Sequence, residues 1–227
     1  MQLLLYLLLG IACLPITGAV PTFYTSATCP YAQRTSFLLN ILVVPHNTVL
    51  IDLKDKPASF LEVNPHGKVP SFKTDQNECL YESLLLNEYL CEMYSSNLLP
   101  SNPIVRFKIR LAQNNFETLM KTFFKVFVAE DGDLNELNSS LSTFNDSLTS
   151  GYICGDCLTL ADVNCAPFFH RLIIGYKVKG YDVLGKWKNV KDWWERIEET
   201  TEWKNCRLED DRVEEGLIRM KEMMIKK

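Results

Sequence analysis

The sequence predicts an α/β plus all-α protein, in which a small mixed sheet with helices on its faces is followed by an all-helical part. From residue 20 to about residue 98, strand-like and helix-like segments alternate in the order βαβαββα, a pattern typical of helices packed on a sheet. A linker with two prolines spans residues 99–103. Beyond it the pattern is helical throughout. We therefore expect two domains, at residues 20–98 and 103–227.

The first domain is assigned from local signals. The helix at 30–42 is predicted because its apolar residues fall on one face. The run VPSFKTDQNECLY predicts a hairpin, since Asp-Gln-Asn interrupts it at residues 75–77. The predicted elements are, in order, a strand at 20–25, a helix at 30–42, a strand at 47–52, a short helix from 58 that ends at 64–65, a hairpin at 69–81 and a helix at 83–95.

The second domain is predicted to be all-α. In the segment from Leu134 to Leu148, apolar residues recur at 3-4-3-4 spacing, which indicates a core-facing stripe. Thr159 followed by Asp162 has the pattern of a capping box and opens a buried helix. The predicted helices are at 104–128, from 134 to 148, from 159 to about 176, at 190–200, and from about 210 to the C-terminus, where the helix is amphipathic.

Composition excludes several classes of protein. Apolar residues make up 47% of the chain and charged residues 23%, which argues against disorder. The net charge is −4 and no basic stripe occurs, so we expect no nucleic-acid partner.

The first nineteen residues predict a secretory signal peptide. They contain no charged side chain, and their apolar run, Leu3 to Leu14, is shorter than the about 20 residues that a membrane span needs. A small-residue site at residues 17–19 follows Pro15, which favours cleavage after Ala19. We therefore expect a protein that is secreted or lies in the lumen of the secretory pathway, without membrane contact beyond the signal. A retained anchor and a buried segment of the fold are the alternatives.

The cysteines and histidines do not predict a metal site. Of eight cysteines, Cys13 leaves with the signal, and the remaining odd number leaves at least one thiol free or paired between chains. Cys154 and Cys157 form a lone C-x-x-C without a second pair, so we interpret them as ordinary buried cysteines, with a disulfide as the alternative. The histidines lack metal-ligand spacing, and we expect all three at the surface: His46, His66 and His170.

The most specific motif is Thr28-Cys29-Pro30, which lies between the first predicted strand and the first predicted helix. Free N–H groups at a helix start favour a thiolate, so we expect Cys29 to ionise below the usual pKa of about 8.5. Pro30 suits the first helical position. Ala32 stands where a C-x-x-C motif has its second thiol, so an outside thiol must resolve any disulfide at Cys29. The alternative is a half-buried cysteine in a turn.

Two further elements have the character of a binding site. Pro70 opens a strand edge after Val69, where a peptide backbone could pair, and it is a candidate cis proline; the alternative is a trans turn proline. Glu82 and Ser83 open a helix, where free N–H groups and a hydroxyl suit a carboxylate. The alternative there is simple N-capping by Ser83.

These elements together resemble one family. The runs CPYAQR, LKDKP, NPHGKVPSF and YESLLLNEYL occur in the order and spacing of the glutathione-binding domain of omega-class glutathione transferases. The later runs YICGDCLTLADV and WKNVKDWWERIEE are similar to stretches of the helical domain, so the resemblance covers residues 20–227. It implies a thioredoxin-like first domain, a helical second domain, and glutathione in the cleft between them. Lys68 departs from the family, in which a bulky apolar residue is common at this position.

The resemblance also implies roles for residues. Cys29 would form a mixed disulfide with glutathione. Val69, before cis Pro70, would pair its backbone with the cysteinyl unit. Glu82 and Ser83 would hold the γ-glutamyl amine and carboxylate. The glycyl carboxylate would be held by Lys56.

The implied function is a glutathione-dependent thiol transferase and dehydroascorbate reductase. Glutathione would be the co-substrate, small oxidised or electrophilic molecules the second substrates, and a homodimer the assembly, with no metal. One alternative is a secreted binding or carrier protein of the same fold. A second is a membrane-inserting protein like the chloride intracellular channel proteins, which share the fold. Their motif has Ser where Ala32 stands, and this difference, together with the intact Glu82-Ser83 pair, favours the transferase.

Overall fold

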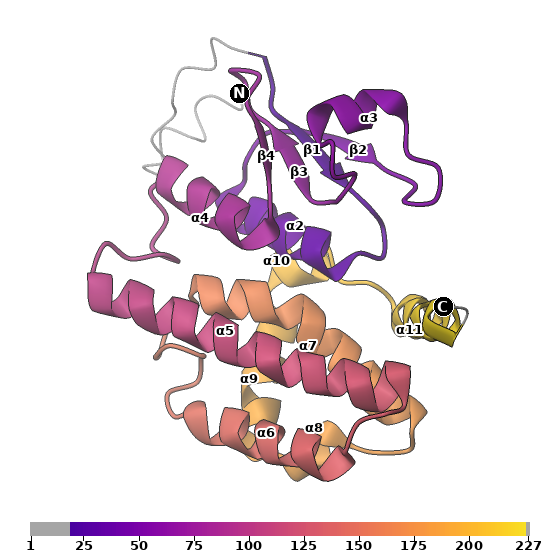
Figure 1. Cartoon of the computed structure of the whole chain (residues 1–227). Coiled ribbons are helices and arrows are strands. Elements are labelled where there is room, and N and C mark those ends of the chain that lie inside the picture. The colour runs from indigo at the N-terminus through magenta and orange to yellow at the C-terminus, as the bar shows by residue number, and fades with distance from the viewer. Residues whose placement is uncertain (1–18, 226–227) are drawn as a thin grey trace.

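The computed structural model describes residues 19–225, and its two parts form an upper and a lower lobe in Figure 1. Apart from Ala19, the predicted signal peptide lies outside the described residues. The elements of the upper lobe are β1 (Thr22–Thr25), α2 (Pro30–Leu42), β2 (Asn47–Leu50), α3 (Ala58–Val63), β3 (Ser71–Lys73), β4 (Cys79–Tyr81) and α4 (Ser83–Met93). The predicted order βαβαββα is therefore confirmed.

The four strands form one mixed sheet in the order β2-β1-β3-β4. β1 runs parallel to β2, with α2 as the crossover between them, and antiparallel to β3. β3 and β4 are the predicted hairpin, in which Phe72 lies opposite Leu80. A parallel βαβ unit joined to an antiparallel hairpin in this order is a thioredoxin-like arrangement.

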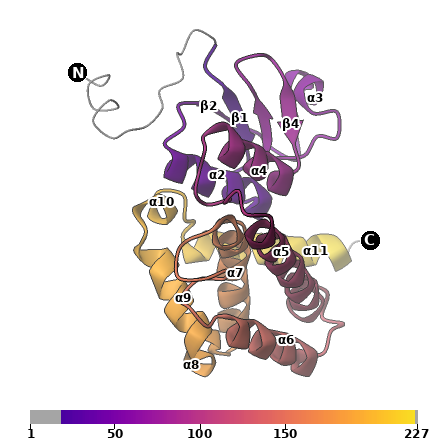
Figure 2. The same ribbon diagram turned by 90° about the vertical axis from the view of Figure 1, so that its left-hand side faces the viewer.

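The two faces of the sheet are covered by different helices, because successive side chains of β1 point to opposite sides. Phe23 and Phe72 belong to the large core that includes α2 and α4. Tyr24 packs on the other side, with its ring centroid 5.7 Å from that of Phe60 in α3. As a result α2 and α4 lie between the sheet and the lower lobe, and α3 lies away from it (Figures 1 and 2).

The lower lobe is helical, as predicted. Its elements are α5 (Pro103–Phe124), a π-helical turn η1 (Lys125–Ala129), α6 (Leu134–Ser147), α7 (Leu160–Val178), α8 (Val183–Lys186), α9 (Lys188–Glu199), α10 (Thr201–Lys204) and α11 (Asp210–Ile225). The predicted helix at 104–128 differs because its last turn changes to π geometry. The short helices α8 and α10 were not predicted, since four residues are too few to show a period.

One apolar core runs through both lobes. Phe37 of α2 is fully buried and meets Trp203 of α10 with ring centroids 5.3 Å apart. Leu38 and Leu90, from α2 and α4, belong to the same cluster as the tryptophans of α9. Because this core is continuous across the two lobes, the helical lobe helps to hold α2 in place.

The start of α7 is fixed by one buried carboxylate. Asp162 accepts hydrogen bonds from the backbone N–H and hydroxyl of Thr159, each at 2.8 Å, so the predicted capping box is confirmed. The same carboxylate accepts from the Ile153 N–H at 2.8 Å and from Trp193 Nε1 at 2.9 Å. Asp162 therefore ties the helix to α9 and to the preceding loop.

Among residues 19–225, no helix combines the length and the hydropathy that crossing a bilayer requires.

Candidate active site

Cys29 lies at the start of α2, immediately before Pro30 at the first helical position. Its carbonyl accepts the first helical hydrogen bond, from Gln33 at 3.0 Å, and its N–H donates to Ser26 in the preceding turn at 3.2 Å. The half-buried Cys29 thiol donates to the carbonyl oxygen of Val69 at 3.7 Å. The structure thus brings together two predicted site residues that are forty positions apart in the chain.

The expected lowering of the Cys29 pKa is not found. Burial raises the pKa of this thiol above its usual value and outweighs the backbone N–H groups of Ala32 and Tyr31 and the charges of Arg171 and Arg34, all of which lower it. The physical reason is that the thiol packs against a small apolar cluster formed by Ala32, Ile51, Phe60 and Val69. A thiolate formed at Cys29 therefore requires a nearby positive charge to offset the loss of hydration.

The peptide bond between Val69 and Pro70 is cis, as the sequence suggested. Both residues are buried, and β3 begins directly after them. Asn64 fixes this turn, since its Nδ2 donates to the Lys68 carbonyl at 2.9 Å and to the Ser71 hydroxyl at 3.0 Å. The backbone of Val69 is held next to the thiol in this way.

Glu82 and Ser83 begin α4 in an unusual conformation. Glu82 has φ +69°, in a region that residues other than glycine seldom adopt, and its side chain is exposed. Ser83 is buried, and its hydroxyl accepts a hydrogen bond from Arg34 Nη1 at 3.3 Å. Simple N-capping by Ser83 is therefore not what the structure contains, because Glu82 occupies the N-cap position and neither side chain caps the helix.

Lys56 is exposed and lies beside Gly67, in the loop that leads to Val69. It approaches Gly67 so closely that a Cβ added to that glycine would lie 3.1 Å from Lys56 Cδ and Nζ. The position of the Lys56 ammonium group therefore depends on Gly67 in the loop before Val69. This is the group that the family resemblance assigned to the glycyl carboxylate of glutathione.

Two buried arginines complete the site, and neither was predicted from the sequence. Arg34, on α2, donates from Nε to the Asn164 carbonyl at 2.7 Å, and its guanidinium carbon lies 4.2 Å from the ring centre of Phe168. Its Nη2 forms an ion pair with Glu117 at 3.6 Å. Arg171, on α7, donates to the Thr28 carbonyl at 3.1 Å. The sequence signal that could have found them is a charged residue among the apolar residues of a predicted helix.

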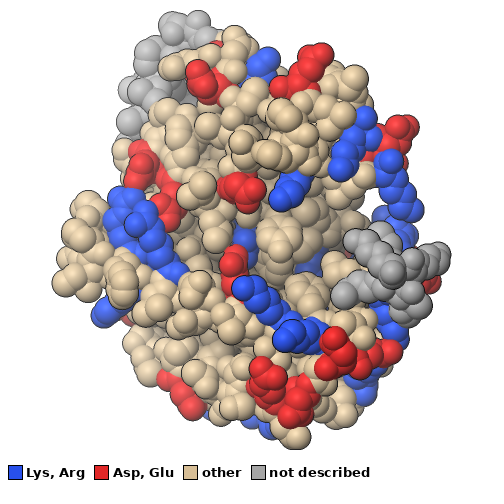
Figure 3. Space-filling view, viewed as in Figure 1, with Lys and Arg blue, Asp and Glu red and all other residues tan. Residues whose placement is uncertain are grey.

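Figure 3 shows a hollow between the two lobes, with Lys and Arg atoms deep inside it. On the rest of this face, basic and acidic side chains are interspersed.

The expectation for the histidines is wrong in one case. His46 is half-buried and His66 exposed, but His170 is 1% exposed. It lies among the rings of Trp194 and Trp203, and burial lowers its pKa to about 4. His170 lies in the stretch of α7 from Leu160 to Leu172, in which every residue is buried, so its side chain cannot reach the surface.

The cysteines also differ from the prediction. Each cysteine within residues 19–225 is a free thiol. Cys154 is half-buried, but Cys157 is exposed, because it lies in the loop before α7. In this described part of the chain, no cluster of three or more Cys, His, Asp or Glu side chains has a metal-binding geometry.

The fold and site define a class of protein in which a thioredoxin-like domain, with a cysteine at a helix start and a cis proline beside it, is packed on a helical domain. Residues 23–98 match the glutathione S-transferase N-terminal domain, and residues 113–200 match the glutathione S-transferase C-terminal domain. The chain belongs to the glutathione S-transferase family.

Curated relatives agree with this assignment. A Drosophila melanogaster pyrimidodiazepine synthase is 31% identical over 166 residues, covering 70% of this chain and 68% of the relative. Glutathione S-transferase omega-1 of Sus scrofa is 31% identical over 70% of this chain and 69% of its own. The chloroplastic glutathione S-transferase DHAR3 of Arabidopsis thaliana is 29% identical over 88% and 77%.

A solved structure confirms the fold. Glutathione transferase Omega 2C of Trametes versicolor superposes with a TM-score of 0.77 at 23% identity, over 88% of this chain and 98% of that one.

Proposed function

We propose that the protein is an omega-type, glutathione-dependent thiol transferase and dehydroascorbate reductase that works through a mixed disulfide at Cys29. The observation that carries the proposal is the position of the thiol. It lies at the start of α2, 3.7 Å from the Val69 carbonyl, without a resolving cysteine at Ala32. The omega-class and DHAR3 relatives support this assignment.

The chemistry follows from thiol–disulfide exchange. The Cys29 thiolate attacks the glutathione sulfur of a mixed disulfide, forms a Cys29–glutathione disulfide and releases the substrate as a thiolate, which takes up a proton. A second glutathione thiolate then attacks the glutathione sulfur on Cys29. Oxidised glutathione leaves and the Cys29 thiolate is restored. With dehydroascorbate, two glutathiones supply the two electrons and two protons that form ascorbate.

Glutathione is proposed to bind with its three units on three elements. Val69 presents its backbone to the cysteinyl unit. Glu82 and Ser83, at the start of α4, take the γ-glutamyl amine and carboxylate, a place where helix N–H groups favour an anion. Lys56 supplies a charge for the glycyl carboxylate. The exposed side chains of Glu82 and Lys56 and the open helix start support these roles.

The experiment compares the wild-type protein with Cys29→Ala and Cys29→Ser. Incubation with oxidised glutathione, followed by mass spectrometry of the Cys29 peptide, should show an adduct of one glutathione in the wild type alone. Both variants should lose thiol transfer and dehydroascorbate reduction. Cys29→Ser should gain conjugation of an aryl halide, because a hydroxyl can donate to a bound glutathione thiolate and leave it free to attack.

Two outcomes would overturn this proposal. Undiminished thiol transfer in Cys29→Ala would place the chemistry on another cysteine, such as Cys154 or Cys157. Binding of glutathione without any adduct would favour the carrier alternative.

We also propose a homodimer that uses an apolar stripe on α5. Ile104, Phe107 and Leu111 lie on one face of this helix and are 67%, 64% and 45% exposed. Contiguous apolar surface of this kind marks an interaction site. In sedimentation experiments, Phe107→Asp and Leu111→Asp should shift a dimer to a monomer, whereas Ile218→Asp on α11 should not. A wild-type monomer at micromolar concentration would contradict this assembly.

Secretion remains a proposal that rests on the first nineteen residues alone. N-terminal sequencing of protein collected from culture medium should begin at Val20, and an intact Met1 would contradict it.

A further inference from the structure

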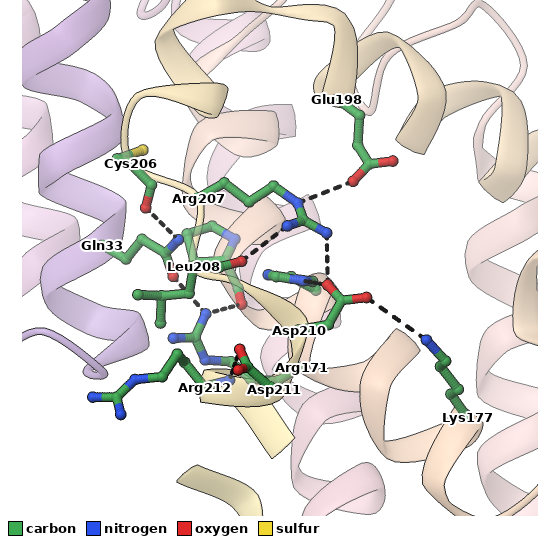
Figure 4. A network of polar contacts seen from close by, with 12 residues as sticks. Gln33, Arg171, Lys177, Glu198, Cys206, Arg207, Leu208, Asp210, Asp211 and Arg212 are labelled. Carbon is green, nitrogen blue, oxygen red and sulfur yellow. Dashed lines mark hydrogen bonds and ion pairs between the residues drawn. The ribbon is translucent and has the colours of Figure 1, made fainter. Parts of the chain in front are cut away.

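Arg171 is a buried cation that is bonded only to neutral oxygens. The residue is 5% exposed. Its Nη1 donates to Gln33 Oε1 at 2.5 Å and to the Pro167 carbonyl at 2.6 Å, and its Nη2 donates to the Thr28 carbonyl at 3.1 Å. Figure 4 shows this guanidinium between α2 and the segment that leads into α11, with Gln33 bonded in turn to the Cys206 carbonyl at 2.9 Å.

The other charged groups of this region are paired among themselves. Asp210 accepts from Arg207 Nη2 at 2.6 Å, and Glu198 pairs with Arg207 at 3.2 Å (Figure 4). Asp210 also accepts from His170 Nε2 at 3.0 Å. Within residues 19–225, no described carboxylate approaches the Arg171 guanidinium to ion-pair distance. Buried charges in proteins are normally paired, so this site is short of one anion.

The group next to Arg171 that can supply an anion is the Cys29 thiol. Arg171 holds the carbonyl of Thr28, the residue directly before Cys29. Burial lowers the pKa of Arg171 to about 10, and the charge of Cys29 is the one influence that raises it. Conversely, the charge of Arg171 lowers the pKa of Cys29, against the opposing effect of burial. The two groups stabilise each other's charged forms.

We propose that Arg171 is the counter-charge of the Cys29 thiolate, a positioning residue supplied by the helical lobe that both fixes the loop at Thr28 and favours the ionised sulfur. The inference deepens the proposed function and rests on it, in that Cys29 is taken as the working thiol.

This arrangement assists both exchange steps. In the first step, it raises the fraction of Cys29 that is ionised and able to attack the glutathione sulfur. When the mixed disulfide forms, the negative charge moves to the departing thiolate and Arg171 is left without its anion. In the second step, Cys29 is the leaving group, and a stabilised leaving thiolate departs faster. Arg171 therefore favours the return to free enzyme over accumulation of the glutathionylated form.

Other charged groups face the thiol or its neighbours. Arg34 acts on the thiol from α2, the same helix that carries Tyr31. Glu82, before α4, and Glu117, on α5, act on Tyr31. Because these groups stay constant when Arg171 is replaced, a shift in the titration of Cys29 reports on Arg171.

The test measures the rate at which iodoacetamide alkylates Cys29 from pH 6 to pH 11, followed on the Cys29 peptide by mass spectrometry without glutathione. Arg171→Met should shift the midpoint upward by about one pH unit, and so reduce the rate at pH 7 about tenfold. Arg171→Lys keeps the charge but not the planar guanidinium group, so its midpoint should lie between those of the wild type and Arg171→Met. Arg212→Met, which removes an equal charge from the exposed surface of α11, should match the wild type.

A second variant leaves Arg171 in place. Gln33→Glu keeps an oxygen against Arg171 Nη1 but supplies the missing anion, so it should also raise the midpoint for Cys29. Its loss of the bond to Cys206 is monitored by thermal unfolding. If Gln33→Glu and a folded Arg171→Met both titrate like the wild type, the proposal is wrong. Alkylation needs no turnover, so this experiment tests the role of Arg171 alone. The proposed function is tested separately, by thiol transfer in Cys29→Ala.

Discussion

Arg34 donates a hydrogen bond from Nη1 to the hydroxyl of Ser83, 3.3 Å away, so that a buried guanidinium lies directly behind the start of α4. The helix start already offers free N–H groups, and the guanidinium adds a full positive charge in a region from which water is excluded. An anion bound at Ser83 would therefore interact with the charge on α2 as well as with α4.

Replacing Arg34 should weaken the binding of glutathione through its γ-glutamyl carboxylate. Arg34→Met should raise the Kd for S-methylglutathione about tenfold, which corresponds to about 1.4 kcal/mol, because it removes the positive charge behind the start of α4. Calorimetry gives the Kd, and the matched ligand is γ-aminobutyryl-S-methylcysteinylglycine, which lacks that carboxylate. The variant should bind this ligand as the wild type does. Equal losses for both ligands would contradict the assignment.

Replacing Gly67 should displace the Lys56 side chain. Gly67 has φ +60°, and a methyl group there would lie 3.1 Å from Lys56 Nζ. Gly67→Ala should therefore destabilise the fold by about 1 kcal/mol and displace the ammonium group. Lys56→Met should weaken glutathione binding about threefold to tenfold without a change in Tm, because its side chain is exposed. If Gly67→Ala binds glutathione as tightly as the wild type does, Lys56 does not hold the glycyl carboxylate.

Removal of the Asp162 carboxylate should strongly destabilise the helical lobe. Its four donors would lose their acceptor in a buried place, so Asp162→Ala should lower the free energy of unfolding by about 3 kcal/mol. The control is Asp133→Ala at the start of α6, where an exposed carboxylate accepts one bond, from Asn135 N–H at 2.8 Å. That cap should contribute about 1 kcal/mol. Urea unfolding measures both, and equal losses would contradict the role of Asp162.

Acid should destabilise the protein through His170. The pKa of this side chain is lowered to about 4 in the folded protein, whereas an unfolded histidine titrates near pH 6.5. The unfolded chain therefore binds more protons between these values. The contribution is fully present above about pH 6.5 and is lost as the pH falls toward 4, by about 2 kcal/mol at pH 5.

The measurement is urea unfolding at pH 7.5 and pH 5.0 for the wild type and His170→Phe, which keeps a ring against Trp194 but cannot titrate. The wild type should lose about 2 kcal/mol more than the variant over this interval. Identical losses would show that His170 is not responsible.

The sequence predicted those features that depend on local chain geometry. The helix start at Cys29, the cis bond at Pro70 and the capping box at Asp162 each have a signal within four residues. For this reason the order of elements and the position of the thiol agree with the structure.

The features that were missed or wrong depend on distant parts of the chain. Arg34 bonds the Asn164 carbonyl, 130 positions away, and Arg171 bonds the Thr28 carbonyl, 143 positions away. Sequence periodicity does not predict contacts between residues so far apart. His170 is buried because other elements cover this part of α7, residues 160–172, on all sides. The pKa of Cys29 was misjudged for the same reason, since counting N–H groups at a helix start leaves out the apolar side chains that cover the sulfur.

The bonds at Arg34 and Arg171 cross between the lobes in opposite directions, one from α2 to α7 and one from α7 to the loop before α2. The two halves are thus not interchangeable modules. A chimera that joins residues 19–98 to the helical half of another family member should keep a working thiol loop only where the new partner supplies an arginine at the position of Arg171 and a free carbonyl at that of Asn164. Engineering of substrate range by domain exchange should therefore begin with these two positions rather than with the linker.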